Sequence, residues 1–243
     1  MDEKNLKLLL VLFALAIVSC SNNDKDTIQN EETTVTDIEG NRYQTVNIGN
    51  QTWMAENLKT TTFSDGSSIT EYEHFNQPSF PWYDPNNPQE LFQWAFTGDL
   101  NNIYPEELLF DFYGAHYNYQ AIQSGKLEID GWRLPTQQDF NELIDYLESQ
   151  GHTGNQATVL KSEIGWTASS GNGTNLYGFN VRPAGNTIIA GTPDFSELIA
   201  RLSTSEINMV NNTRKVATFF GNGEIEFEDI DIRFGLSIRL IKE

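Results

Sequence analysis

The residues best suited to chemistry lie in an aromatic-rich stretch, residues 72–119, which holds about half of the aromatic side chains of this 243-residue chain. Trp82, Tyr83 and Trp94 offer flat faces of the kind that stack on sugar rings. The same rings could instead pack a long segment onto the domain, because each buried aromatic side chain removes about 150–250 Å² from water. We expect a mixed outcome, with most rings buried and one or two exposed as a ligand surface.

Polar side chains accompany these rings. Asp84, Asn86 and Asn87 could exchange hydrogen bonds with sugar hydroxyls. Asp99 and Asn101 place oxygen atoms at alternating positions, which calcium accepts, although the central glycine and terminal glutamate of an EF-hand are absent. We therefore predict no cofactor apart from a possible calcium ion, and a solvated loop is the alternative at both sets of residues.

The sequence selects no catalytic group. His74, His116 and His152 lie in separate segments without the spacing of metal ligands. No serine stands in a nucleophile-elbow pattern, and no motif picks two carboxylates out of the 34 acidic residues for glycosidic cleavage. A hydrolase stays an alternative without an assigned catalytic residue.

The single cysteine, Cys20, follows an apolar run at residues 8–18 that is preceded by lysines and is too short to span a membrane. Ile17-Val18-Ser19-Cys20 resembles a bacterial lipobox, in which the cysteine is lipidated and becomes the mature N-terminus. An ordinary signal peptide with an incidental cysteine is the alternative. Lipidation of Cys20 would leave the folded domain without any thiol.

This pattern predicts three segments: a lipoprotein signal peptide at residues 1–19, a flexible tether at 20–34 and one folded domain at 35–243. The tether has almost no apolar residues, as expected of a segment that does not pack. We expect a cell-envelope protein held by its lipid, with the outer membrane as the location and its surface or periplasmic face left open. The formal charge of −19 disfavours nucleic acid as a partner.

The clearest element is a helix at about residues 136–150. Thr136 and Asp139 have the spacing of a capping box, and an apolar stripe with helical periodicity follows from Phe140. Short strands and turns are expected at residues 35–54 and through the C-terminal part, including a strand at residues 177–185. These patterns predict an α+β fold with short antiparallel strands, one main helix and long irregular loops.

Several segments resemble the Fibrobacter succinogenes major paralogous domain. They are Asp37–Tyr43, Ile48–Leu58, Tyr113–Tyr119, Gly131–Thr136, Tyr177–Asn180 with Pro183–Gly185, and Gly235–Arg239. The likeness is collinear over roughly residues 35–243. It implies a secreted or lipid-anchored domain, common in Bacteroidetes and Fibrobacteres, that has no established catalytic role.

The Gly131–Thr136 run is also similar to formylglycine-generating enzymes, and this resemblance implies a single C-type-lectin-like domain. The paired-cysteine chemistry of those enzymes does not transfer, because the domain holds no cysteine. Arg133 and Arg239 are expected to be structural and to bind buried carboxylates or carbonyls. The favoured function is non-catalytic binding of glycan or of a protein partner. The alternatives are a hydrolase acting on polysaccharide or peptide and a structural fimbrial-tip or surface-assembly component.

Overall fold

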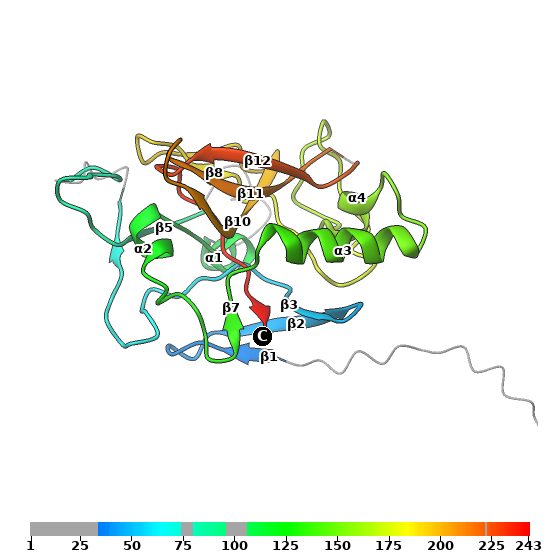
Figure 1. Cartoon of the computed structure of the whole chain (residues 1–243), viewed down its shortest axis with the longest axis horizontal. Coiled ribbons are helices and arrows are strands. Elements are labelled where there is room, and N and C mark those ends of the chain that lie inside the picture. Colours follow the sequence, from blue (N-terminus) through cyan, green and yellow to red (C-terminus); the bar gives the residue numbers. More distant parts are fainter. Residues whose placement is uncertain (1–33, 74–79, 96–105, 222) are drawn as a thin grey trace, which may run out of the picture.

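The computed structural model describes residues 34–73, 80–95, 106–221 and 223–243, and it is a mixed α/β structure built mostly of short, curled antiparallel strands (Figure 1). Its largest sheet has five strands in the order β1-β2-β3-β13-β7. Their bounds are β1 Thr34–Thr36, β2 Arg42–Ile48, β3 Gln51–Met54, β13 Ile241–Lys242 and β7 Trp132–Arg133. Within it, β3 pairs with β13, so strands from the two ends of the described chain lie side by side.

The second sheet contains three longer antiparallel strands in the order β10-β11-β12. They are β10 Ile199–Asn208, β11 Thr213–Phe220 and β12 Glu226–Asp231. A third sheet contains β4 Thr70–Glu71, β5 Leu91–Trp94 and β6 Ala115–Tyr117, and a two-stranded ribbon contains β8 Asn186–Thr187 and β9 Pro193–Asp194. The strands expected through the C-terminal part include β11 and β12, which pair antiparallel.

The main helix, α3, spans Gln137–Ser149, close to the predicted range. Its capping box is confirmed: the Asp139 backbone N–H donates to Thr136 Oγ1 at 3.1 Å, and the Thr136 N–H donates to Asp139 Oδ2 at 2.6 Å. Arg133 donates a hydrogen bond to each carboxylate oxygen of Asp139, both at 2.8 Å. The other helices are shorter: α1 Glu106–Tyr113, α2 Tyr119–Gln123 and α4 Gln156–Leu160.

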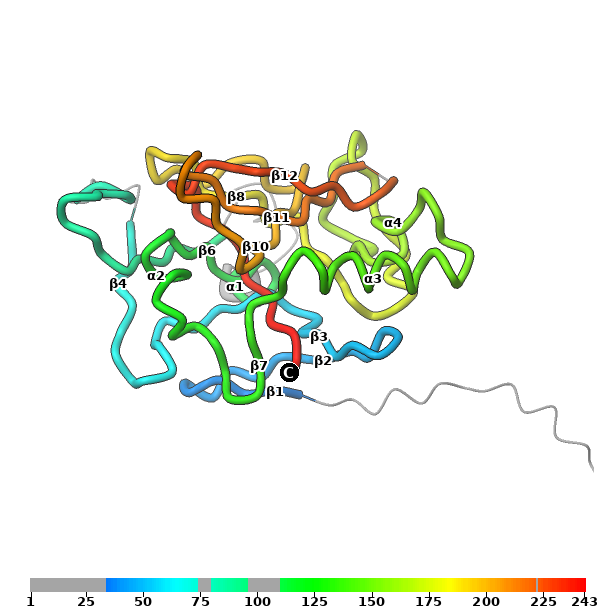
Figure 2. The backbone as a smooth tube through the Cα atoms, viewed as in Figure 1, coloured from blue at the N-terminus to red at the C-terminus, as the bar shows by residue number. Residues whose placement is uncertain are grey.

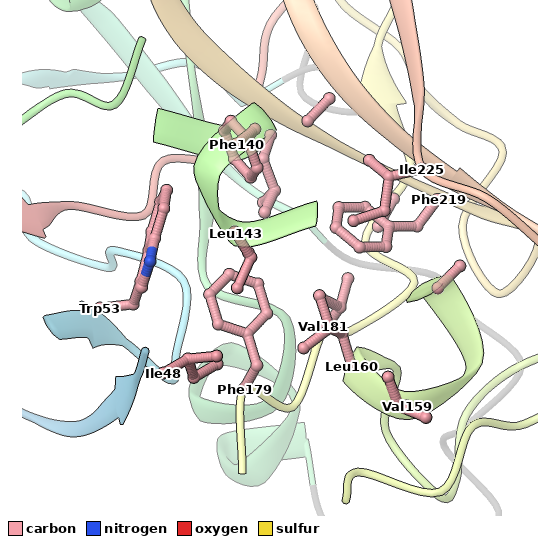
Figure 3. Packing of buried hydrophobic residues seen from close by; sticks show 14 of the residues in the cluster. Ile48, Trp53, Phe140, Leu143, Val159, Leu160, Phe179, Val181, Phe219 and Ile225 are labelled. Carbon is pink, nitrogen blue, oxygen red and sulfur yellow. The ribbon is translucent and has the colours of Figure 1, made fainter. Parts of the chain in front are cut away.

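The main hydrophobic core joins α3 to both of the larger sheets (Figure 3). Trp53 of β3 packs against Phe140 of α3, with ring centroids 5.0 Å apart, and against Phe179 at 5.5 Å. Phe219 of β11 closes the cluster from the three-stranded sheet. In the smooth backbone trace, α3 runs between the strands of the two sheets (Figure 2).

The strand predicted at residues 177–185 is wrong. Gly178 and Asn180 have positive φ angles of 73° and 58°, which interrupt an extended ladder. The carbonyls of Phe179 and Asn180 instead accept hydrogen bonds from Arg239, whose guanidinium also donates to Asn57 Oδ1 at 2.8 Å. The expectation that Arg133 and Arg239 bind buried carboxylates or carbonyls is thereby confirmed.

Candidate functional site

The aromatic residues predicted to bind a ligand take different positions. Trp82 is only 1% exposed, and its ring lies 5.2 Å from that of Tyr72, so it differs from the expectation of an open stacking face. Trp94 is half-buried and stacks on Phe110 at 4.5 Å. Both rings therefore pack the irregular segment onto the domain, as the alternative interpretation proposed for this stretch.

Tyr83 has a different environment, because it lines an open hollow of about 390 Å³. The hollow is lined by Tyr83, Asn211, Asn212, Asp231, Ile232 and Arg233. These residues come from the loop before β5, the turn between β10 and β11, and the end of β12 with the turn that follows. Three segments far apart in the sequence therefore form one surface site.

The charged wall of the hollow is preorganised. Arg233 Nε donates to Asp231 Oδ1 at 2.9 Å and its Nη2 donates to Asp231 Oδ2 at 2.5 Å, while the Arg233 backbone N–H also donates to Oδ1. The Arg233 guanidinium lowers the pKa of the Asp231 carboxyl below its usual range. Both side chains are partly exposed, so the pair presents an anionic acceptor beside cationic donors to solvent.

The turn that supplies the amide wall is held from within. Asn208 Oδ1 accepts the backbone N–H groups of Val210 at 3.0 Å and Asn211 at 3.2 Å. Asn212 adopts a φ of 53°, and its carbonyl accepts the N–H of Ile232 at 3.0 Å. This last bond fixes the turn against the segment that carries Asp231 and Arg233. The two asparagine side chains are exposed and available to a ligand.

Asn118 positions the loop that carries Tyr83, and we did not single it out from the sequence. It is 1% exposed, and its Oδ1 accepts the N–H groups of Leu91 and Ala121, both at 3.0 Å. Its Nδ2 donates to the carbonyls of Trp82 at 3.2 Å and Gln89 at 2.8 Å. The available signal was an asparagine directly before a short helix, the usual position of an N-cap.

Asn118 also places Tyr83 beside α2. The next residue, Tyr119, meets Tyr83 edge-to-face with ring centroids 6.4 Å apart. Behind Tyr119 lies the guanidinium of Arg214, 6.0 Å from the ring centroid and almost fully buried. Burial lowers the pKa of Arg214 to about 10, and its Nη2 has no hydrogen-bond partner among the described residues.

The other predicted polar residues follow Tyr83 in the loop before β5. Asp84 Oδ1 accepts the backbone N–H of Asn86 at 2.8 Å, which shapes the turn, and the side chains of Asn86 and Asn87 are exposed. The structure thus brings Tyr83, Asp84, Asn86 and Asn87 into one exposed loop and leaves Trp82 and Trp94 out of it. The calcium candidates Asp99 and Asn101, and the lipidation candidate Cys20, lie outside the described residues.

The two described histidines lie away from this hollow. His116 is fully buried, with Nδ1 3.1 Å from Thr187 Oγ1, and that hydroxyl accepts a bond from Gln93 Nε2 at 2.6 Å. The ring of His152 packs edge-on against Tyr177 at 5.6 Å. In the described part of the chain, no three His, Cys, Asp or Glu side chains gather as metal ligands. Across the same residues, no helix is long and apolar enough to cross a membrane.

Two other hollows differ in their lining. One, of about 470 Å³, lies where α3 meets the β2–β3 turn and is lined by Glu142, Asp145 and Tyr146 with backbone and amide groups of that turn. The other, of about 210 Å³, lies between Asp37-Ile38 and Lys126–Asp130. The Tyr83 hollow combines an aromatic ring, two amides and an ion pair, and it includes a residue predicted from the sequence.

These features define a mixed α/β domain, mostly of strands, with a polar surface hollow built on its turns. The chain belongs to the Fibrobacter succinogenes major domain family, whose model matches residues 46–242. The match begins within β2 and ends within β13, and it confirms the family resemblance seen in the sequence. Neither a curated protein nor a solved structure matches the chain. The similarity to formylglycine-generating enzymes stays a prediction.

Proposed function

We propose that this domain binds carbohydrate without catalysis and that the Tyr83 hollow is its binding site. The observation that carries the proposal is the meeting of one aromatic ring, two exposed amides and a bidentate ion pair in a single open hollow. Sugars offer an apolar ring face and a rim of hydroxyls. An aromatic ring packs against the apolar face of the sugar. Carboxylate and amide oxygens accept hydrogen bonds from the sugar hydroxyls, and amide and guanidinium N–H groups donate to them.

The size of the hollow suits a small part of a glycan. A hollow of about 390 Å³ lies within the range of about 300–1,000 Å³ typical of small-molecule sites. Its openness to solvent suits a ligand that continues beyond the site, as a polysaccharide chain does. The neighbouring Asp84, Asn86 and Asn87 would extend the contact along such a chain. Calcium at Asp99 and Asn101 would be an additional element of the same proposal.

We further propose that the domain belongs to a lipoprotein anchored through Cys20 at the cell envelope, in the outer membrane. The pairing of β3 with β13, which places the two ends of the domain together, supports a C-type-lectin-like architecture. Changing Cys20 to Ala tests the anchor. Loss of the protein from the membrane fraction is expected, and continued partition with membranes would refute lipidation at this residue.

The binding site is tested on a glycan array with the chain carrying Cys20→Ala, with and without calcium, followed by titration of any sugar that binds. Tyr83→Ala should weaken binding about tenfold or more, equivalent to about 1.4 kcal/mol, because the stacking face is lost. Tyr83→Phe keeps that face and should retain most of the affinity. Tyr146→Ala, in the hollow on α3, is the matched control and should bind as the parent chain does.

The outcomes separate the alternatives. An array without any signal refutes carbohydrate binding. Loss of binding in Tyr146→Ala with full binding in Tyr83→Ala moves the site to α3. A surface-assembly component is the second candidate, because Met209 and Val210 at the β10–β11 turn are 61% and 90% exposed. Concentration-dependent self-association that Val210→Ser abolishes would favour it.

A further inference from the structure

We propose that Met209 is a site of reversible oxidation by peroxide-type oxidants. We further propose that its sulfoxide displaces the residues of the Tyr83 hollow and so weakens ligand binding there. The effect on ligand binding rests on the proposed function, whereas the oxidation of Met209 does not depend on it. Met209 follows β10 in the turn that also carries Asn211 and Asn212. Its sulfur accepts a hydrogen bond from the Tyr119 hydroxyl at 3.6 Å.

The chain contains an internal comparison for this reactivity. It has three methionines: Met1, Met54 and Met209. Met1 lies outside the described residues. Met54 is 0% exposed, and its sulfur accepts the backbone N–H of Leu240 at 3.4 Å, whereas Met209 is 61% exposed. Because oxidation of a thioether follows access to the oxidant, Met209 should react well before Met54.

The reaction is balanced with the oxidant alone. A lone pair of the Met209 sulfur attacks one oxygen of hydrogen peroxide, the O–O bond breaks and an S–O bond forms. The other oxygen leaves as water after proton transfer. Sulfur loses two electrons, and the peroxide is reduced by two. The product is a polar sulfoxide, which reductases of the methionine sulfoxide class can return to the thioether.

The effect on the hollow follows from the contacts of Tyr119. A thioether is a weak acceptor, and a sulfoxide oxygen is a much stronger one that extends beyond the sulfur atom. The Tyr119 hydroxyl would bond to that oxygen and give up its present position against the sulfur. Since Tyr119 meets Tyr83 edge-to-face, the displacement passes to the aromatic wall of the hollow. Asn211 and Asn212 follow Met209 in the same turn, so we expect their amides to shift when the sulfoxide forms.

The experiment uses the full chain with Cys20→Ala, so that no thiol competes for the oxidant. Peptide mass spectrometry after timed exposure to hydrogen peroxide should show Met209 oxidised about tenfold or more faster than Met54. Amide NMR of the same samples should show shifts at Tyr83, Asn211 and Asn212. Equal oxidation rates at the two methionines, or an unmoved Tyr83 amide after complete oxidation of Met209, would overturn the proposal.

Two variants isolate the route. In Met209→Leu, peroxide should leave the three amides unmoved. In Tyr119→Phe, Met209 should still oxidise and move Asn211, but the shift at Tyr83 should disappear, because the hydroxyl link is gone. A shift at Tyr83 that persists in either variant contradicts the proposed route. The NMR measurement needs no sugar, so failure of the unmodified chain to bind glycan would refute the proposed function alone.

Discussion

The stability of the domain should fall between pH 8 and pH 5 because of one buried histidine. His116 lies in β6, fully buried, with its Nδ1 beside the Thr187 hydroxyl. That hydroxyl accepts from Gln93, so its own proton is available to His116 Nδ1, and we infer a neutral ring. Burial lowers the pKa of His116 from its ordinary 6.5 to about 3, because a charged imidazolium would lose its hydration.

The sign follows from proton linkage. Between pH 6.5 and pH 3 the unfolded chain binds a proton at His116 and the folded protein does not, so stability rises with pH in this window. The contribution is fully present above pH 6.5 and is lost as the pH falls. For these two pKa values, the expected loss between pH 8 and pH 5 is about 2 kcal/mol. Asp139 and Asp65, with pKa values lowered to about 2 by their hydrogen bonds, act only below about pH 4.

Urea unfolding at pH 8, 7, 6 and 5 measures this loss. The parent chain should lose about 2 kcal/mol over the range. His116→Gln, although less stable at pH 8, should lose much less, because its side chain at position 116 does not titrate. His152→Gln is the matched control and should keep the parent dependence. The reasoning is refuted if His116→Gln loses as much stability between pH 8 and pH 5 as the parent chain does.

Other substitutions test the positioning of the site and scaffold. Asn118→Ala removes four hydrogen bonds and should cost about 2–4 kcal/mol in urea unfolding, with weaker glycan binding; an unchanged midpoint would contradict the role given to this amide. Gly173→Ala would place its Cβ 2.3 Å from the Lys161 carbonyl oxygen, so we expect its thermal midpoint to be several degrees lower than that of the parent. Gly223→Ala is the control, because its Cβ meets nothing within 4 Å, and it should unfold at the parent temperature. Asp139→Ala breaks the capping box and the ion pair with Arg133, and it should lower the free energy of unfolding by about 1–2 kcal/mol. A urea midpoint equal to that of the parent chain would contradict this expectation.

Local signals predicted the scaffold well. The start of α3 follows from Thr136 and Asp139, because a capping box is satisfied within four residues of the chain. The expected binding of carbonyls by Arg239 is also found, although its partners, at residues 179 and 180, could not be named. The same partners explain the failed strand at residues 177–185. An alternating apolar pattern predicts a strand, but it does not reveal that a distant arginine will donate to the backbone carbonyls that strand pairing would use.

The candidate site depended on non-local information. Tyr83 is among the predicted ligand residues, but Asp231 and Arg233 lie about 150 positions further along the chain. Asp231 and Arg233 are two residues apart, so their pairing is local. Their meeting with Tyr83 depends on long-range contacts, such as those of Tyr119 with Tyr83 and with Arg214. Trp82 and Tyr83 both carry rings whose chemistry suits sugar stacking, so the sequence does not distinguish them. Only the three-dimensional contacts show that one ring faces Tyr72 and the core while the other faces the hollow.

The separation of scaffold and site has a consequence for how ligand preference can change. The turns that line the hollow take little part in the main core, which is formed by α3 and the two larger sheets. Asn118 joins the loop of Tyr83 to α2, and the Asn212 carbonyl joins the β10–β11 turn to Ile232. Exchange of the exposed side chains at Asn86, Asn87 or Asn211 leaves these links intact. Such changes should therefore alter the bound sugar while the free energy of urea unfolding stays within about 0.5 kcal/mol of the parent value.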